Sequence, residues 1–291
     1  MDERAAVALV TNQVEAAGDD AAVVDGTVLT TDMLHERTDF PPGTTRYTAG
    51  WRSVGVSLSD LAATGARAQA AVAVYAAPGF DPRELTAFLR GAKEVCEAVD
   101  AEYVGGDLDG HEEFTVATTA LGETEDPVGR SGATPGEVVC VTGGLGRSGA
   151  AVRLFERGDP DRANELFRFS PRVRAGRAVA PGATAMMDVS DGLARSLHQL
   201  SEASDCGFAL DGSSIPVDPV VDAVATDAED HRELSLFFGE DFELVFTVPA
   251  DRVEAVSENA PVEVSVVGEV VDSGVRIDGD PLPDCGYTHG R

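Results

Sequence analysis

Acidic side chains recur beside Gly, Ser or Thr at six places along the chain, and this pattern constrains the fold more than any other. The six segments are Gly18-Asp-Asp20, Thr30-Thr-Asp32, Ser59-Asp60, Gly106-Asp107, Asp188-Val-Ser-Asp191-Gly and Gly239-Glu-Asp241. One such acid alone is typical of a solvated surface or a helix cap. As a set they can converge, because turns at the ends of strands and helices can meet in space. Several carboxylates converge only around cations, since like charges disfavour one another's ionisation. Oxygen ligands with few His or Cys favour Mg²⁺ over zinc.

The segment Asp188-Val-Ser-Asp-Gly-Leu193 is the sharpest of these patterns. Ser190 can cap a helix whose apolar face carries Leu193 and Leu197, and the helix amino terminus would favour an anion. Asp188 is expected to end a strand and Asp191 to begin the helix, so both can reach one ion. The alternative is a capped helix with an Asp that compensates the helix dipole. The local pattern leaves the two interpretations open.

A second motif suggests a different class of protein. Residues 141–149, Val-Thr-Gly-Gly-Leu-Gly-Arg-Ser-Gly, contain a formal G-x-G-x-x-G between an expected strand and an expected helix. A dinucleotide-binding fold also requires a second parallel strand that ends in an acid about 20 residues later. The chain instead continues through Arg-Gly-Asp-Pro-Asp-Arg into helical sequence. A tight turn between a strand and a helix is the favoured interpretation. A Walker A sequence is absent as well.

The overall charge excludes several partners. There are 51 Asp and Glu against 22 Lys and Arg, a formal net charge of −29, and a single Lys, Lys93. Such a chain has no general attraction for nucleic acid or anionic lipid. The longest apolar run, residues 70–77, is too short to span a membrane, and the first residues lack the pattern of a signal peptide. We therefore expect a soluble, cytoplasmic protein. The spread of acids along the chain predicts adaptation to high salt, where self-repulsion is screened. The four Cys lack metal-ligand spacing and are expected to be free thiols.

The apolar periodicity predicts strands and helices mixed in both halves, without a strict alternating rhythm. We expect helices over 2–17, after a cap at Thr44 or Thr45, over 82–99, from the turn at 146 to about 179, and over 190–203. Strands are expected over 21–24, 28–31, 69–75, 102–104, 114–120, 137–141, 184–188, 207–210, 242–248 and around 262–277, with a turn at Gly105-Gly106-Asp107. The strand over 69–75 is expected to be buried. The loop at 130–136 is rich in Gly and Pro. The chain is predicted to be α+β, with domains at 1–130 and 131–291.

Taken in order, the motifs resemble those of the thiamine-monophosphate kinase family. They are GDDAAVV, TTDMLHERTDF, VSLSDLAATGA, GGDL, GRSGATPGE, DVSDGL and GEDFEL, which span residues 18 to 244, with Gly286-Tyr287 near the end. The resemblance implies the two-domain fold of aminoimidazole ribonucleotide synthetase and its relatives, with mixed sheets and flanking helices. It also implies transfer of the ATP γ-phosphoryl group to thiamine monophosphate, dependence on Mg²⁺, and a homodimer formed through the first domain.

The resemblance also implies roles for individual residues. Magnesium ligands are implied at Asp20, Thr30, Thr31, Asp32, Asp60, Asp107, Asp188 and Asp191. Gly106, Asp107, Arg130 and Ser190 are implied to contact ATP. Glu240 and Tyr287 resemble the residues that hold the thiamine moiety, and Asp39 stands at a substrate position where bacterial members usually carry His. Asp60, Asp107, Arg130 and Asp191 are the implied catalytic residues. Phe242 and Leu108 are milder departures, from Tyr and Thr.

The residue inventory agrees with such chemistry. The acceptor is a phosphate oxygen, largely deprotonated near neutral pH because its second pKa is about 6, so a general base is unnecessary. The obstacle is repulsion between two anions, which metal ions bound by carboxylates relieve while Arg130 adds a guanidinium. We expect direct transfer without a phosphoenzyme. The alternatives are another ATP-dependent enzyme of the superfamily, such as a purine-pathway synthetase, an NAD(P)-dependent oxidoreductase, or a non-catalytic cation-binding dimer.

Overall fold

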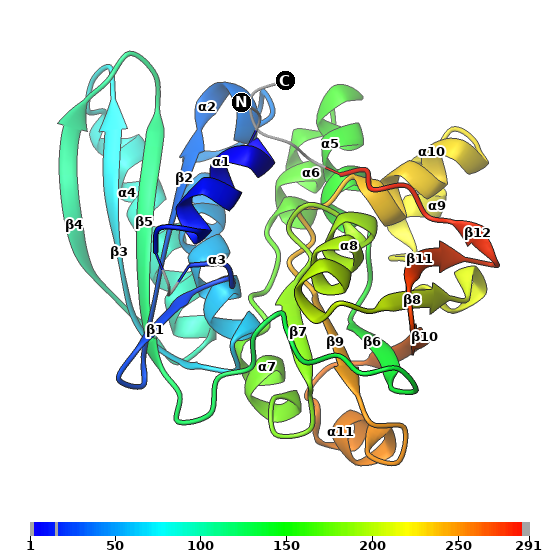
Figure 1. The fold of residues 1–291 in the computed structure, drawn as a ribbon. Coiled ribbons are helices and arrows are strands. Elements are labelled where there is room, and N and C mark those ends of the chain that lie inside the picture. The colour runs from blue at the N-terminus through cyan, green and yellow to red at the C-terminus, as the bar shows by residue number, and fades with distance from the viewer. Residues whose placement is uncertain (1–2, 15–16, 287–291) are drawn as a thin grey trace.

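The amino-terminal half forms a five-stranded sheet. The computed structural model describes residues 3–14 and 17–286, and Figure 1 shows their arrangement. The strand order is β1-β2-β5-β3-β4, with only β3 and β4 parallel. The strands are β1 (Ala22–Val24), β2 (Thr27–His35), β3 (Arg67–Ala77), β4 (Glu102–Gly110) and β5 (Thr115–Glu123), and the helices are α1 (Glu3–Thr11), α2 (Glu36–Asp39), α3 (Arg46–Ala63) and α4 (Pro82–Ala98).

Helix α3 is the centre of the molecule. Thr45 caps it by accepting a hydrogen bond from the Thr48 amide at 3.2 Å, as the sequence predicts, and the chain turns away at Gly65. The helix packs on β2, β5 and α4, and on the other side it contacts the second half of the chain (Figure 1). Sequence periodicity predicts one apolar face, but α3 is buried almost all round because protein covers both of its sides.

The carboxyl-terminal half forms a seven-stranded sheet in the order β12-β11-β8-β10-β6-β9-β7, with only β8 and β11 parallel. Its strands are β6 (Val138–Thr142), β7 (Ala185–Asp188), β8 (Gly207–Leu210), β9 (Leu244–Val248), β10 (Val264–Val271), β11 (Gly274–Ile277) and β12 (Asp280–Pro281). Its helices are α5 (Arg147–Glu156), α6 (Pro160–Phe167), α7 (Val173–Val179), α8 (Leu193–Ser204), α9 (Val220–Val224), α10 (Ala228–Arg232) and α11 (Val253–Asn259), with a π-helix at Glu233–Phe237 and a 3₁₀ turn at Gly212–Ser214.

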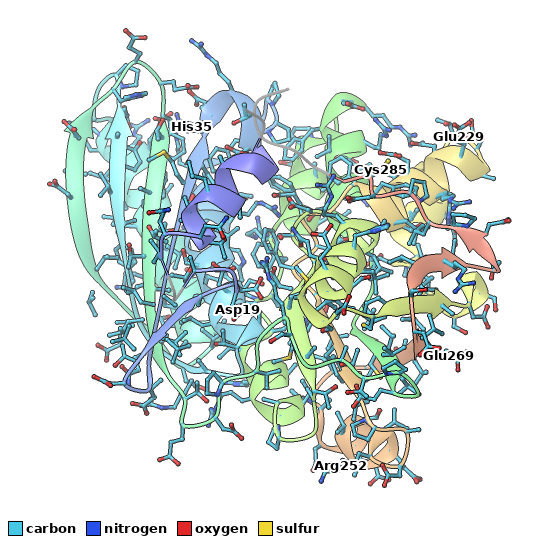
Figure 2. The ribbon with its side chains drawn as sticks, in the orientation of Figure 1. Asp19, His35, Glu229, Arg252, Glu269 and Cys285 are labelled. Carbon is cyan, nitrogen blue, oxygen red and sulfur yellow. The ribbon has the colours of Figure 1, made fainter. Side chains whose placement is uncertain are left out.

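The predicted α+β class with two mixed sheets and flanking helices is confirmed. The four Cys are free thiols, as predicted. The division at residues 130 and 131 stays a prediction. No helix in the described residues is both long and apolar enough to cross a membrane. Acidic side chains such as Glu229 on α10 and Glu269 on β10 are exposed on different elements, as the spread of acids along the chain predicts (Figure 2).

Four local predictions are wrong. The predicted turn at Gly105-Gly106-Asp107 is part of β4, which passes so close to β3 that a Cβ on Gly106 would lie 1.7 Å from the Ala73 carbonyl oxygen. The strand predicted as buried, β3, has alternating exposed side chains, because one face of its sheet is uncovered. Helix α1 ends at Thr11 rather than near residue 17. Helix α8 begins at Leu193, after Gly192, so Ser190 is not its cap.

Candidate functional site

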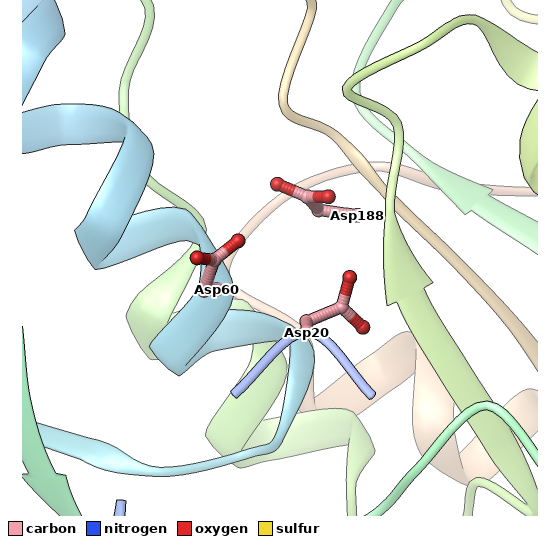
Figure 3. A group of neighbouring side chains, drawn as sticks. All are labelled: Asp20, Asp60 and Asp188. Carbon is pink, nitrogen blue, oxygen red and sulfur yellow. The ribbon is translucent and has the colours of Figure 1, made fainter. Parts of the chain in front are cut away.

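Three aspartates from distant parts of the chain meet at one point (Figure 3). Asp20 lies in the loop before β1, Asp60 near the end of α3, and Asp188 at the end of β7. One carboxylate oxygen from each lies within 4.8 Å of the others. Asp188 is buried, whereas Asp20 and Asp60, counted with their backbone atoms, keep some exposure. The sheets and α3 therefore assemble a cluster of oxygen ligands from residues up to 168 positions apart in the sequence.

The three carboxylates are held under electrostatic strain. Burial, followed by repulsion from Asp32, Asp188 and Asp20, raises the pKa of Asp60 well above its ordinary value. Burial and the neighbouring Asp20 raise the pKa of Asp188 to about 8. Ionised together without a cation, these groups destabilise one another. A cluster of this kind fits a hard divalent cation, which would offset both the cost of burying the charges and their mutual repulsion.

Hydroxyl groups orient the aspartates. Thr30 Oγ1 donates to Asp60 Oδ2 at 2.5 Å, and Ser59 Oγ donates to Asp188 Oδ2 at 2.5 Å. Ser57 Oγ donates to Asp32 Oδ2 at 2.6 Å. These donors leave the other carboxylate oxygen of each aspartate available to a ligand. The sequence analysis missed the roles of Ser57 and Ser59, although both lie in the same segment as Asp60.

Arg130 is the cation nearest to this cluster. Its Nη2 lies 2.7 Å from Asp20 Oδ1, and its backbone amide donates to Asp19 Oδ1 at 2.7 Å. The Asp20 side chain is only 4% exposed and the Arg130 side chain 23% exposed. The partial exposure lets the guanidinium reach an anion in the adjoining cavity.

A cavity of about 250 Å³ adjoins the cluster. Its polar lining is Asp19, Asp20, Asp32, Asp39, Asp60, Arg130, Asp188, Ser190, Asp191 and Glu240, and its apolar lining is Met33, Leu34, Val56 and Phe242. A larger hollow of about 510 Å³ lies elsewhere, beside Arg153, and is lined by a partly buried Arg153–Asp230 ion pair. The smaller cavity joins an acidic end, suited to cations and phosphates, to an apolar end suited to an organic ring.

Two of the predicted substrate residues lie in this cavity. Asp39 Oδ2 accepts from the His35 amide at 2.6 Å and from Thr38 Oγ1 at 2.8 Å, so the side chain is fixed at the end of α2. Glu240 has a φ of +62°, and its amide donates to the Ser190 carbonyl at 2.6 Å. Tyr287, the third predicted substrate residue, lies outside the described residues.

The glycine-rich motif binds a carboxylate of the chain itself, next to Glu240 in the sequence. The Asp241 carboxylate accepts hydrogen bonds from the amides of Gly146 at 2.6 Å and Ser148 at 3.0 Å, at the amino terminus of α5. The position that a cofactor phosphate would take in a dinucleotide-binding fold is therefore filled by the chain's own carboxylate. Strand β6 also has antiparallel partners on both sides. The dinucleotide-binding alternative is excluded by this topology, because it requires a parallel neighbour.

Other predicted site residues do not reach the cluster within one chain. Thr31 and Asp107 lie on the face of the five-stranded sheet that is turned away from α3, with Asp107 paired beside Val74. Two strands, β5 and β3, separate β2 from β4, which carries Gly106 and Asp107. The structure therefore brings together Asp20, Thr30, Asp32, Asp39, Asp60, Arg130, Asp188, Ser190, Asp191 and Glu240. Thr31 lines a separate hollow beside Asp20, and Gly106 and Asp107 lie apart.

One buried cation was missed by the sequence analysis. Arg52 on α3 is fully buried, and its Nη2 lies 2.5 Å from Glu240 Oε2. The two residues are 188 positions apart, so the sequence carries no local signal of their pairing.

Comparisons with known proteins agree with the fold and the site. A family model described as AIR synthase related protein, N-terminal domain, matches residues 18–124, and one for the C-terminal domain matches residues 134–279. The chain is 63% identical to a thiamine-monophosphate kinase of Halobacterium salinarum, over 99% of this chain and 100% of the relative. It is 39% identical to one of Methanospirillum hungatei, over 94% of each.

Among solved structures, one described as AaThiL complexed with AMPPCP and TMP superposes with a TM-score of 0.91 at 28% identity, over 99% of this chain and 97% of that chain. Fold and site thus define a two-domain enzyme of the AIR synthase related class. Within that class, the sequence identity to thiamine-monophosphate kinases over nearly the whole chain shows which family the chain belongs to. The chain belongs to the thiamine-monophosphate kinase family.

Proposed function

We propose that this protein is a cytoplasmic phosphotransferase that moves the γ-phosphoryl group of ATP to thiamine monophosphate, giving thiamine diphosphate and ADP. The observation that carries the proposal is the convergence of Asp20, Asp60 and Asp188 beside a cavity with an apolar end. The relative known as AaThiL, which has the same fold, is described in complex with AMPPCP and TMP.

Magnesium fits the residues present. Asp20, Asp60 and Asp188 would hold it, with Asp32 and Asp191 in the lining of the same cavity and Thr30 hydrogen-bonded to Asp60. The raised pKa values of Asp60 and Asp188 support this assignment, because they reflect negative charge that Arg130 alone does not balance. Bound magnesium would supply charge neutralisation for the phosphates of both substrates.

The protein's own groups would position the reactants. Arg130 offers a forked guanidinium to phosphate oxygens at the mouth of the Asp20 site. The acceptor phosphate carries its own nucleophilic oxygen, so proton abstraction by the protein is unnecessary. Accordingly, His is not among the residues that line the cavity in the described part of the chain. Catalysis then rests on alignment and charge balance, and transfer is direct.

The other end of the cavity suits the organic part of thiamine monophosphate. Leu34, Val56 and Phe242 provide an apolar wall, and Phe242 stacks on Phe169 with ring centroids 4.2 Å apart. Asp39 and Glu240 place carboxylates beside this wall, where they would attract the cationic thiazolium ring. Asp39 thus supplies negative charge at a position where bacterial members usually carry His.

A homodimer would complete the site. The face of the five-stranded sheet turned away from α3 exposes apolar side chains, with Met33 57% and Val104 58% exposed. Leu29, Val72 and Val74 add to this patch, and a contiguous apolar face of this kind is typical of a protein interface. Thr31 and Asp107 lie on the same face. Two-fold packing on this face would place Thr31 near Asp107 of the partner subunit, and so join the predicted ligands that one chain keeps apart.

The direct test is an assay with ATP, thiamine monophosphate and Mg²⁺ in molar KCl, in which thiamine diphosphate and ADP are measured by chromatography. We expect equal amounts of both products and no products after EDTA. The Asp60→Asn variant should lower kcat by a factor of at least about 100, whereas the exposed control Asp251→Asn should not change it. Formation of ADP without thiamine diphosphate would be consistent with an ATP-dependent enzyme of the superfamily, but it would refute thiamine monophosphate as the substrate.

A further inference from the structure

Arg52 occupies an unusual place for a charged residue. It lies in the middle of α3 with 0% of its side chain exposed. Its Nη1 donates to the Phe167 carbonyl at 2.5 Å, and its guanidinium carbon lies 3.7 Å from the centroid of the Phe167 ring. Its Nε is buried without a hydrogen-bond partner among the described residues. Burying a guanidinium in this way costs free energy, and a well-packed apolar side chain would often be as stable.

The carboxylate that faces Arg52 is that of Glu240. Nη2 of Arg52 lies 2.5 Å from Glu240 Oε2, and the Glu240 side chain is 27% exposed toward the cavity. The backbone of Glu240 is fixed as well, because its carbonyl accepts a hydrogen bond from Ser148 Oγ at 2.5 Å. One oxygen of Glu240 is thereby held in the interior, and Oε1 is the oxygen left for a ligand.

The Glu240 carboxylate could also turn toward the aspartates, which lie in the same cavity. Glu240 and Asp32 line the same cavity. A Glu240 side chain free to rotate could therefore turn toward the metal-binding end of the cavity. Arg52 opposes this because its guanidinium is paired with Glu240 and is itself held in the interior, 3.7 Å from the centroid of the Phe167 ring and 5.6 Å from that of Phe242.

We propose that Arg52 is a positioning residue for substrate recognition, which holds Glu240 at the apolar end of the cavity with Oε1 directed to the cationic ring of the substrate. This inference rests on the proposed function, because it takes Glu240 to be the residue that contacts the organic part of thiamine monophosphate. Arg52 itself does not touch the substrate. Its contribution is to fix one orientation of Glu240 and to balance part of the negative charge that Asp39 and Asp241 add nearby.

The test is a double-mutant cycle on the full-length dimer in molar KCl, with Arg52→Met, Glu240→Gln and the double variant. Each single substitution should raise the KM for thiamine monophosphate about tenfold and change the KM for ATP less than about twofold. The KM of the double variant for thiamine monophosphate should not exceed the larger of the two single-variant values, because both substitutions remove the same contact. Arg168→Met is the control, since Arg168 contacts Thr48 and the Tyr47 ring rather than the cavity, and it should leave both constants unchanged.

Two results would overturn the inference. The first is a roughly hundredfold rise in the KM of the double variant, because independent effects multiply. The second is an equal rise of both KM values in Arg52→Met. If Arg52→Met does not fold, the same cycle is made with Arg52→Lys, which keeps the charge but not the forked geometry, and the same criteria apply. A wild-type protein that forms no thiamine diphosphate would overturn the proposed function and this inference together, whereas an active wild type with multiplying effects overturns only the role of Arg52.

Discussion

Removing one charge from the aspartate cluster should stabilise the metal-free protein while it abolishes activity. Asp188 is the best position, because it is buried and its pKa is raised to about 8 by burial and by Asp20. A carboxyl whose pKa is higher in the folded than in the unfolded state favours folding when protonated. Its contribution is therefore lost as the pH rises from about 4, the unfolded value, to about 8. Above that range, ionised Asp188 destabilises the fold.

The size of the effect follows from the shift. A rise of about 4 pKa units corresponds to about 6 kcal/mol, which is an upper limit. Asp188→Asn keeps the shape and an oxygen for the Ser59 hydroxyl, but it loses the attraction of Arg130. We expect the free energy of unfolding at pH 8.5 in EDTA to increase by about 1–3 kcal/mol.

Urea unfolding in molar KCl with EDTA measures this difference, and it is repeated at pH 5 and with Mg²⁺. At pH 5 the gain should shrink, because wild-type Asp188 is then protonated. With Mg²⁺ the order should reverse, because the wild type gains binding energy that the variant lacks. The kcat of the variant should fall at least about 100-fold. A variant that is less stable than the wild type at pH 8.5 in EDTA would refute the argument that the cluster is under electrostatic strain.

Three further predictions concern other parts of the molecule. Burial raises the pKa of Asp241 to about 7, so this group makes the protein less stable as the pH rises from about 4 to about 7. In urea unfolding, the free energy of unfolding should therefore fall less between pH 5 and pH 8 in Asp241→Asn than in the wild type. Val74→Asp on the outward sheet face should halve the mass in sedimentation equilibrium and lower activity at least about tenfold, whereas Leu89→Asp on α4, away from that face, should do neither. Lowering KCl from 2 M to 0.1 M should lower the Tm by more than about 10 °C, because the Debye length grows from about 2 Å to about 10 Å and the net charge of −29 is no longer screened; an unchanged Tm would refute the adaptation to salt.

Local sequence signals predicted the elements that local forces determine. The hairpin of β1 and β2 follows from Asp25-Gly26, both of which have positive φ angles. Helix α4 is predicted from the regular spacing of its apolar residues, and in the structure Asp81 caps it. In both cases the deciding interactions join residues that are a few positions apart.

The errors arose where distant segments decide the structure. Two consecutive glycines usually indicate a turn, but Gly106 is required by the approach of β3, which lies about 30 residues away in sequence. Ser190 has the residue type and spacing of a helix cap, yet its carbonyl is bound by the Glu240 amide from another part of the chain, and α8 begins later. Arg52 falls at an ordinary position on a helical wheel, and only the folded chain brings Glu240 beside it.

The acidity of this chain has two separate origins, and the side chains around each carboxylate distinguish them. Asp32, Asp60 and Asp188 each accept a hydroxyl hydrogen bond from Ser57, Thr30 or Ser59, which fixes one oxygen inside the protein. Acids on the surface instead pair with exposed Arg or cap helices, as Glu123 and Asp81 do. A surface acid can be lost at little cost, because exposed ion pairs contribute little. An acid that is buried, oriented by a hydroxyl and close to others raises the free energy of the folded protein unless a cation joins it. The geometry of the cluster therefore supports the proposed cation binding, and it is not the arrangement that a solvated acidic surface requires.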